Sequence, residues 1–307
     1  MRIVFMGTPE FAIPSLRILL DHHYQVVAVV TVPDAPSGRG QKMTSSAVKR
    51  FAMARDLPVL QPGSLKEPDF QHQLRSFSPD LFVVVAFRIL PRDVFSIPRN
   101  GAFNLHASLL PKYRGAAPIQ WAVINGEKET GVTTFFLEEK VDTGNMILQM
   151  KIPIGENDTA GEMHDKLAML GATVVLETVQ MIEQGKALPQ AQDNSLASPA
   201  PKIFNEQCRI DWQKPARKVH DFIRGLSPKP GAWTHHDGTL LKLYRSRLDD
   251  MNVPPGEPGT VLDVPGRFIV QTGNGVVEIT ELQQEGKKLL SAHEFLRGYP
   301  IKAGDRL

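Results

Sequence analysis

The sequence predicts an α/β protein: a doubly wound, parallel-rich sheet in residues 1–188 and a small β-barrel in residues 206–307. Strand and helix signals alternate through the first hundred residues, which is typical of βα units with right-handed crossovers. The apolar run Asp80–Phe87 suits the middle of a parallel sheet. After residue 206, short strands are separated by Gly, Pro, Asp and Asn, which is typical of a small barrel. A length of 307 residues is enough for two domains.

The elements of the first part follow from apolar spacing and from the residues that begin or end helices. The predicted strands are Arg2–Met6, Gln25–Val32, Val59–Leu60, Asp80–Phe87 and Gly101–Phe103. The predicted helices are Pro14–Asp21, Ser45–Arg55 and Leu65–Phe77. Ligand sites of such sheets lie beyond the carboxyl ends of the strands.

From Thr130 the periodicity becomes two, which predicts paired strands over Thr130–Glu138 and Met146–Ile154. The pattern Thr159-x-x-Glu162 is a capping box that opens a helix over Ala160–Gly185. Residues 189–205 lose periodicity and gather small and polar residues, so we expect a linker there. The elements predicted beyond it are a helix over Ala216–Leu226 and strands over Ala232–His235, Leu240–Arg247, Gly259–Asp263, Phe268–Thr272 and Val276–Leu282.

Composition and charge limit the function classes. The hydrophobic content of 42% is ordinary for a globular protein. The longest apolar runs are far shorter than the roughly 20 residues of a membrane helix, so we expect a cytoplasmic protein. One cysteine, Cys208, excludes an intramolecular disulfide. Net charge is only +2, but ten basic and four acidic residues lie between Lys202 and Arg247. Such an excess suits phosphate binding, with a solvated surface of scattered lysines as the alternative.

Three polar residues are the candidate catalytic group. Asn104 and His106 alternate at the end of an apolar strand, which points both side chains to one face. Asp142, 36 residues after His106, could orient the imidazole and stabilise its protonated form. An amide donor, a titratable ring and an acid suit acyl transfer to an amine. In the alternative interpretation the first two are satisfied strand-end groups and Asp142 belongs to an Asx-turn.

Two loops could meet a ligand. Gly7–Ala12 follows the first strand but lacks the pattern G-x-G-x-x-G, which removes most support for dinucleotide binding. Asp34–Lys42 places Arg39 between glycines, which suits contact with phosphates, although an exposed turn would use the same residues. The histidines show no spacing typical of a metal site, so we expect no metal.

These motifs together resemble those of the bacterial methionyl-tRNA formyltransferases, over nearly the whole chain. The Asn-x-His block is typical of folate-dependent formyl transfer, and the C-terminal motifs narrow the resemblance to the tRNA enzymes. The matching motifs are Gly7–Ala12, Gly38–Lys42, Asn104–Pro118, Asp142–Gly144, Pro228–Thr234, Gly286–Lys288 and Phe295–Gly298.

The resemblance implies a Rossmann-like formyltransferase domain and an OB-like barrel that holds tRNA. The implied reaction moves a formyl group from 10-formyltetrahydrofolate to the α-amino group of methionine on initiator tRNA. We expect no membrane partner and a monomer, since nothing in the sequence demands a second copy. His106 would handle the proton, Asn104 would donate to the developing oxyanion, and Asp142 would orient His106.

The implied contacts with the two substrates lie in three loops. Folate contacts map to Ser108, Leu109, Leu110 and Pro111 and to Phe87, Arg88, Ile89 and Leu90, and tRNA contacts map to Arg39 and Lys42. Where many members have Tyr-Gly, this chain has Phe87-Arg88, and that arginine could contact the acidic tail of the folate or point to solvent.

Three other functions remain open from the sequence. Another folate-dependent formyltransferase, acting on glycinamide ribonucleotide or on a small amino sugar nucleotide, would share the Asn/His/Asp group; the first of these would not need a basic C-terminal domain. A formyl-folate hydrolase would let water attack in place of an amine. An RNA-binding regulator without turnover would leave Asn104, His106 and Asp142 without a role.

Overall fold

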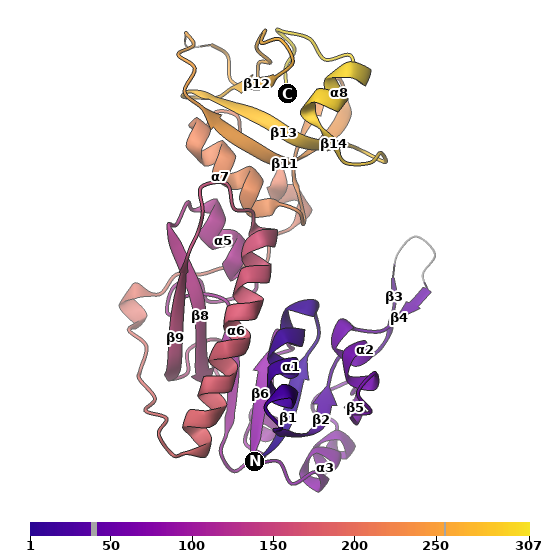
Figure 1. Cartoon of the computed structure of the whole chain (residues 1–307), viewed down its shortest axis with the longest axis vertical. Coiled ribbons are helices and arrows are strands. Elements are labelled where there is room, and N and C mark those ends of the chain that lie inside the picture. The colour runs from indigo at the N-terminus through magenta and orange to yellow at the C-terminus, as the bar shows by residue number, and fades with distance from the viewer. Residues whose placement is uncertain (38–41, 255) are drawn as a thin grey trace. The chain divides into compact units, whose positions relative to one another are not determined.

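The computed structural model describes residues 1–37, 42–254 and 256–307, which form two compact units (Figure 1). Each unit is assembled from separate parts of the chain. Unit 1 contains Met1–Gly115, Gly131–Ile152 and His164–Pro199. Unit 2 contains Ala116–Thr130, Pro153–Met163 and Ala200–Leu307. In the described residues, no helix combines the length and the apolar character needed to cross a bilayer.

Unit 1 is built on a seven-stranded sheet with the order β5-β2-β1-β6-β7-β8-β9 (Figure 1). The strands are β1 (Arg2–Gly7), β2 (Gln25–Val30), β5 (Val59–Leu60), β6 (Leu81–Val85), β7 (Ala102–His106), β8 (Glu129–Phe136) and β9 (Met146–Pro153). The first five strands in this order run parallel, and β8 is antiparallel to β7. The predicted parallel-rich sheet is therefore confirmed. The chain adds strands on one side of β1 and then returns to the other, so the order reverses between β1 and β6.

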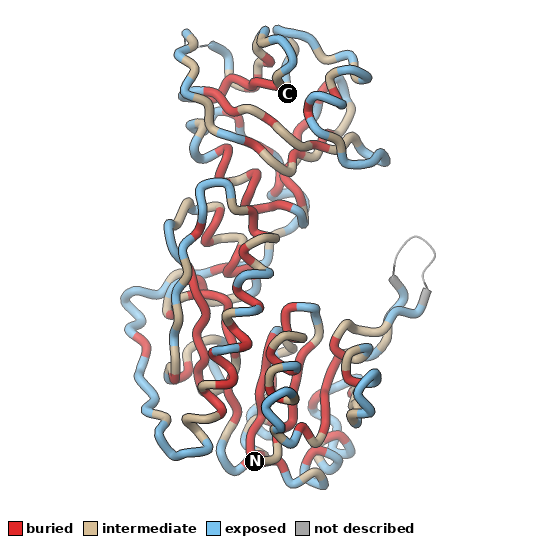
Figure 2. Tube along the Cα trace, in the orientation of Figure 1, coloured by how far each residue is buried: buried red, intermediate tan, exposed pale blue. Residues whose placement is uncertain are grey.

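Helices cover both faces of this sheet. One face packs against α3 (Pro68–Ser76) and α4 (Arg92–Phe95), and its core includes Val4, Met6, Phe70, Leu74, Phe82, Val84, Val94 and Ala102. The other face meets α6 (Ala160–Glu183), which approaches β7 closely at Gly171, where a Cβ would lie 2.6 Å from Leu105 Cδ2. In Figure 1, α6 lies beside α1 (Ile13–Asp21). Burial follows the strands between these layers (Figure 2).

Several elements differ from the sequence prediction. The helix expected from Leu65 begins at Pro68, because proline fits the first helical turn. The strand expected to end at Phe103 continues to His106, so Asn104 and His106 lie within β7. The helix α4 and the hairpin of β3 (Ala35–Ser37) and β4 (Lys42–Thr44) were not predicted, because they are too short to show periodicity. The helix η1 (Glu10–Ala12) precedes α1, and α2 (Ala47–Met53) follows the hairpin.

Unit 2 contains an antiparallel sheet with the order β10-β11-β13-β12, and β14 also pairs with β13. Its strands are β10 (Ala232–His236), β11 (Thr239–Asp249), β12 (Phe268–Gln271), β13 (Val276–Gln284) and β14 (Leu290–Ser291). Its helices are α5 (Pro118–Ile124), α7 (Ala216–Leu226), α8 (Ala292–Gly298) and the short η3 (Asn205–Cys208). The short helix η2 (Asn194–Leu196) belongs to unit 1. The expected small OB-like domain is confirmed as an antiparallel half-barrel, since β10 and β12 end the strand order.

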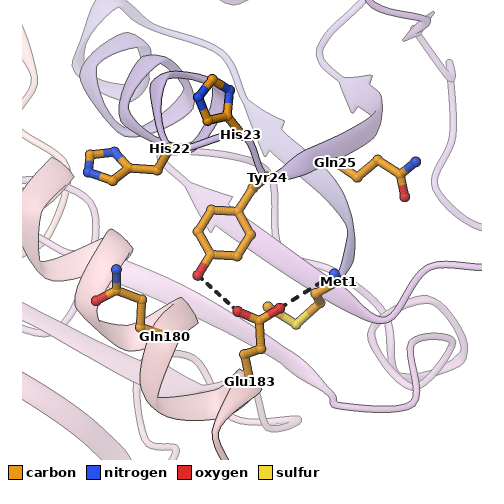
Figure 3. A pocket seen from close by; sticks show the side chains of 7 residues that line it. All are labelled: Met1, His22, His23, Tyr24, Gln25, Gln180 and Glu183. Atoms are coloured by element: carbon orange, nitrogen blue, oxygen red, sulfur yellow. Dashed lines mark hydrogen bonds and ion pairs between the residues drawn. The ribbon is translucent and has the colours of Figure 1, made fainter.

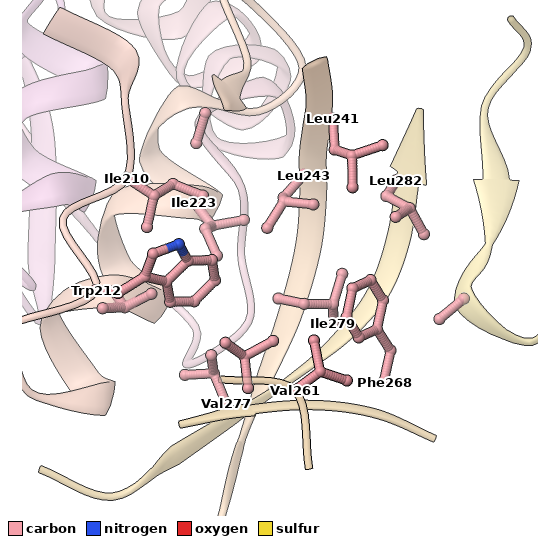
Figure 4. Packing of buried hydrophobic residues seen from close by; sticks show 14 of the residues in the cluster. Ile210, Trp212, Ile223, Leu241, Leu243, Val261, Phe268, Val277, Ile279 and Leu282 are labelled. Atoms are coloured by element: carbon pink, nitrogen blue, oxygen red, sulfur yellow. The ribbon is translucent and has the colours of Figure 1, made fainter. Parts of the chain in front are cut away.

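A hydrophobic core lies between this sheet and α7. Trp212, Ile223, Leu243, Phe268 and Ile279 converge in it (Figure 4). Fully burying one such side chain stabilises a fold by about 1.5–3 kcal/mol. The indole Nε1 of Trp212 donates to Thr234 Oγ1 at 3.2 Å, which satisfies the polar end of the ring.

The predicted strand Gly259–Asp263 is wrong. Thr260 and Val261 form only isolated bridges, the first with Arg306 and the second with Val270. The segment still exchanges backbone hydrogen bonds with β12 on one side and with residues 304–307 on the other, but this pairing amounts to isolated bridges and not to a strand.

Candidate active site

Asn104 and His106 lie at the carboxyl end of β7, at the edge where parallel sheets place ligand sites. They share the face of Ala102, because strand side chains alternate. Ala102 packs in the core with α3 and α4, and Asn104 and His106 follow it toward the carboxyl end of the strand. Asn104 is partly exposed there, whereas His106 is buried.

The imidazole of His106 has a hydrogen-bond partner at one nitrogen and a nearby carboxylate at the other. The residue is 6% exposed, and its Nε2 lies 2.8 Å from the carbonyl oxygen of Tyr113. A carbonyl can only accept, so Nε2 carries a hydrogen in this arrangement. The other nitrogen, Nδ1, lies 3.8 Å from Asp142 Oδ2. Nδ1 is therefore the atom at which the ring can gain or lose a proton, and the doubly protonated ring faces an acceptor at each nitrogen.

Asp142 is fixed by contacts with a distant loop. Its Oδ2 accepts from the backbone N–H of Gly115 at 2.9 Å, and its side chain is 11% exposed. The acceptor bond reaches 27 residues back in sequence, so this carboxylate does more than close a local Asx-turn. Asp142 has a φ of 55°, in the left-handed region. At Gly144 a Cβ would lie 1.7 Å from Phe136 O, so only glycine fits there.

Asn104 is partly buried, and its backbone lies between Val84 of β6 and Phe135 of β8. Its side-chain amide forms no hydrogen bond with the other described residues, unlike His106 and Asp142. The amide can therefore donate to a ligand without breaking an internal bond.

The expected folate loop after β7 is firmly held. Ser108 is fully buried and its hydroxyl donates to Lys112 O at 2.6 Å. Leu110 N donates to Thr133 Oγ1 at 3.2 Å, while Leu109 and Pro111 are partly exposed. Leu109 and Pro111 are therefore the residues of this loop that a ligand can reach. Ser108 and Leu110 are buried and fix the conformation of the loop.

The loop after β6 contains the departure from the family pattern. Arg88 donates from Nη1 to Gly63 O at 3.1 Å and from Nη2 to Pro62 O at 2.9 Å. Burial lowers the pKa of this arginine from its ordinary value. Phe87 lies beneath the guanidinium, Leu90 is buried, and Ile89 is 72% exposed. Arg88 thus joins the loops after β5 and β6.

The residues expected to contact tRNA are only partly described. Arg39 lies outside the described residues, and Lys42 opens β4, where its backbone pairs with Ser37. The hairpin is anchored by Asp34, whose carboxylate accepts from Lys49 Nζ at 2.6 Å and from Gln61 Nε2 at 2.9 Å. These bonds lower the pKa of Asp34, with the Lys49 bond the larger cause.

The basic segment Lys202–Arg247 loses part of its apparent surface charge in the structure. Arg224 is 4% exposed and pairs with Asp221 at 2.7 Å within α7. Arg245 pairs with Glu162 at 2.6 Å, and this bond is the main reason that its pKa is raised. Exposed cations remain at Lys202, Arg209, Lys214, Arg217, Lys218, Lys229 and Arg247.

Sequence reasoning missed several residues that hold these loops. Thr133 and Gln149 lie on the antiparallel strands β8 and β9 and bond to the loop that follows His106. Gln192 and Arg114 connect that loop to the turn of Asp142. Gln192 lies in the segment read as a linker, and no local pattern marks it.

A surface hollow of about 570 Å³ lies at the opposite edge of the sheet. Tyr24 and the N-terminal ammonium of Met1 both meet the carboxylate of Glu183, at 3.1 and 3.5 Å (Figure 3). Burial, followed by the bond to Glu183, raises the pKa of Tyr24 to about 12. Because Met1 and Tyr24 precede β1 and β2, this hollow is at the amino ends of the strands, away from Asn104 and His106. Across the described ranges, no group of three His, Cys, Asp or Glu side chains is arranged to hold a metal ion.

Comparison with known proteins gives matches over nearly the whole chain. A family model described as formyl transferase matches residues 1–179, and another, formyl transferase, C-terminal domain, matches residues 202–300. A methionyl-tRNA formyltransferase of Bacteroides thetaiotaomicron is 48% identical over 318 residues, covering 100% of this chain and 98% of that protein. One of Pelotomaculum thermopropionicum is 48% identical over 307 residues, covering 99% and 97%.

A solved structure also shares the fold. The sugar 3N-formyl transferase WlaRD, in the presence of dTDP and 5-N-formyl-THF, aligns with a TM-score of 0.70 at 22% identity. The alignment covers 94% of this chain and 99% of that chain. At this identity the likeness concerns the fold alone.

Proposed function

The chain belongs to the formyl transferase family, and within it to the methionyl-tRNA formyltransferases, so we propose that it formylates methionyl initiator tRNA. The formyl donor is 10-formyltetrahydrofolate, and the acceptor is the α-amino group of the methionine. The observation that carries the chemistry is the distance of 3.8 Å between His106 Nδ1 and Asp142 Oδ2. Asn104 lies two residues before His106 on β7, and its amide has no hydrogen bond with the other described residues.

The reaction needs stabilisation of charge on oxygen and removal of a proton from nitrogen. A neutral amine attacks the formyl carbon, and negative charge develops on the formyl oxygen. The Asn104 amide donates to that oxygen; one such donor is typically worth about 3–4 kcal/mol in the transition state. His106 takes up the amine proton at Nδ1, and Asp142 stabilises the resulting imidazolium. The bond between the formyl carbon and N10 of the folate then breaks, and N10 receives the proton from the imidazolium, which gives formylmethionyl-tRNA and tetrahydrofolate.

The folate-binding surface is assigned to the loops after β6 and β7. It comprises Phe87, Arg88, Ile89 and Leu90 together with Ser108, Leu109, Leu110 and Pro111. Support comes from their place at the carboxyl edge beside Asn104 and His106, and from the partial exposure of Leu109 and Pro111. Because both Nη atoms of Arg88 already bond to carbonyls, its role is to hold the loop after β6 to the loop after β5.

The tRNA-binding surface is assigned to the hairpin loop and the C-terminal domain. Arg39 and Lys42 contact the acceptor arm, and the exposed cations of residues 206–307 contact the phosphate backbone. We divide the chain into a catalytic domain, residues 1–188, a linker, 189–205, and a tRNA-binding domain, 206–307. The separate family matches to residues 1–179 and 202–300 support this division. We further propose that the enzyme acts in the cytoplasm as a monomer without a metal.

The deciding experiment measures formyl transfer from 10-formyltetrahydrofolate to four acceptors. These are charged initiator tRNA, uncharged initiator tRNA, free methionine and a nucleotide-linked amino sugar. We expect turnover only with the charged tRNA. Formylation of the amino sugar with no response to charged tRNA would instead establish the small-amine alternative, and release of formate without any acceptor would establish a hydrolase.

A further inference from the structure

Gln192 lies in the non-periodic segment between α6 and unit 2, yet it is only 9% exposed. Both ends of its side chain are fully used. Nε2 donates to Asp142 O at 3.0 Å and to Gly144 O at 2.8 Å. Oε1 accepts from Arg114 Nε at 3.1 Å and Nη2 at 2.6 Å. The orientation of the amide is determined by its partners, because guanidinium groups only donate and carbonyls only accept.

The two segments that Gln192 joins are those that hold the catalytic imidazole. One is the turn of Asp142, whose carboxylate faces His106 Nδ1. The other is the loop around Arg114, in which Tyr113 O accepts from His106 Nε2 and Gly115 N donates to Asp142. The loop, the turn and Gln192 therefore form one closed set of hydrogen bonds, to which His106 is joined through Tyr113 O.

The segment that carries Gln192 belongs to unit 1 and is held there by hydrogen bonds on both sides of Gln192. The backbones of Gln190 and Met146 exchange two hydrogen bonds of 2.8 Å. Asn194 Oδ1 accepts from Arg114 Nη2 at 2.8 Å, and Ser198 O accepts from Arg114 N at 2.9 Å. The Gln192 segment is therefore fixed to the start of β9, just after the Asp142 turn, and to the Arg114 loop.

We infer that Gln192 is a positioning residue for formyl transfer: it keeps the Asp142 carboxylate beside His106 by tying the Asp142 turn to the Arg114 loop. This inference rests on the proposed function, because it assumes that the Asp142–His106 pair serves the reaction. A displacement of about 1 Å in such a pair can lower turnover by roughly a hundredfold.

The first test compares two replacements of Gln192 with a matched control. Gln192→Met keeps the length of the side chain but removes every bond of the amide. Gln192→Glu keeps the acceptor for Arg114 and removes the donors to Asp142 O and Gly144 O. We expect both to lower kcat about 10- to 100-fold, with KM for each substrate changed by less than about threefold. Gln190→Met, an exposed side chain two residues away, should leave kcat unchanged.

The second test separates positioning from general stability by a double-mutant cycle with Asp142→Asn. If Gln192 acts through Asp142, adding Gln192→Met to Asp142→Asn should lower kcat by less than about threefold more. Losses that multiply in the double variant, or a Gln192→Glu enzyme with full kcat, would overturn the inference. Thermal unfolding of each variant identifies any variant that fails to fold. If Gln192→Met does not fold, the kcat of Gln192→Glu, whose side chain has the same size as that of Gln192, tests the inference.

Failure of the inference and failure of the proposed function give different results. A wild-type enzyme that does not formylate charged tRNA contradicts the proposed function. A wild-type enzyme that does so, with Gln192 variants of full activity, contradicts only the role of Gln192.

Discussion

At the scale of single residues, hydrogen-bond partners decide what the imidazole of His106 can do. The carbonyl of Tyr113 holds a hydrogen on Nε2, so Nδ1 is the nitrogen that the proposed proton transfer uses. The alternation of β7 predicted that Asn104 and His106 share a face, and the strand places them so. The sequence could not predict the partner of Nε2, because a backbone carbonyl is present at every residue and leaves no signature.

Replacing His106 tests the proton role directly. His106→Gln keeps an amide donor for Tyr113 O but cannot carry a proton at neutral pH. We expect kcat to fall by roughly 10²- to 10⁴-fold, while folate binding, measured by fluorescence or calorimetry, is retained. His72→Gln, an exposed histidine on α3, is the control and should keep full activity. Near-wild-type turnover of His106→Gln would refute the role of the ring.

At the scale of elements, the turn between β8 and β9 is shaped by steric exclusion. Asp142 adopts a φ of 55°, and Gly144 lies against the carbonyl of Phe136. Period-two alternation predicted the two strands around it. The pattern Asp-Thr-Gly indicated a turn. It did not indicate which group donates to the carboxylate, because that donor, the N–H of Gly115, lies 27 residues away.

Gly144→Ala should disturb both stability and catalysis. The new Cβ would lie 1.7 Å from Phe136 O, so the turn must shift and carry Asp142 with it. We expect a loss of about 1–3 kcal/mol in the free energy of unfolding, measured by denaturant titration, together with a lower kcat. Gly298→Ala at the end of α8, where a Cβ meets open space, is the control. A Gly144→Ala protein with wild-type stability would show that the turn is not sterically constrained.

At the scale of the whole molecule, each compact unit draws on distant parts of the chain. Residues 116–130 and 153–163 fold with the C-terminal half-barrel, although they precede it in sequence. Within unit 2, α7 holds the second of these segments by buried polar bonds. His220 is fully buried, with Nε2 3.0 Å from Glu156 O and Nδ1 2.9 Å from Ser246 Oγ. Arg224 donates to Asp158 O at 2.9 Å.

His220 should make the stability of this unit depend on pH. Burial, the largest cause, lowers the pKa of His220 below its ordinary value of 6.5; Glu156 O and Asp221 oppose this, whereas Arg224 and Arg217 add to it. Below pH 6.5 the unfolded chain takes up a proton that the folded chain resists, so stability falls as pH drops from 6.5 toward the lowered pKa. We expect a shallower pH dependence of thermal unfolding in His220→Gln than in the wild type.

The exposed His235 on β10 supplies the comparison for that measurement, since His235→Gln should keep the wild-type pH dependence. An unchanged slope in His220→Gln would mean that other groups account for the acid sensitivity.

The sequence by itself determined the parallel-rich sheet, the small antiparallel domain, and the placement of Asn104 and His106 at a carboxyl edge. These follow from periodicity and residue order, which act between near neighbours. Only the tertiary structure decided that Asp142 approaches His106 within 3.8 Å, that a supposed linker supplies Gln192, and that part of the basic segment is internally paired. The physical reason is that hydrogen bonds and ion pairs between residues far apart in sequence depend on how the chain packs, which local patterns do not record.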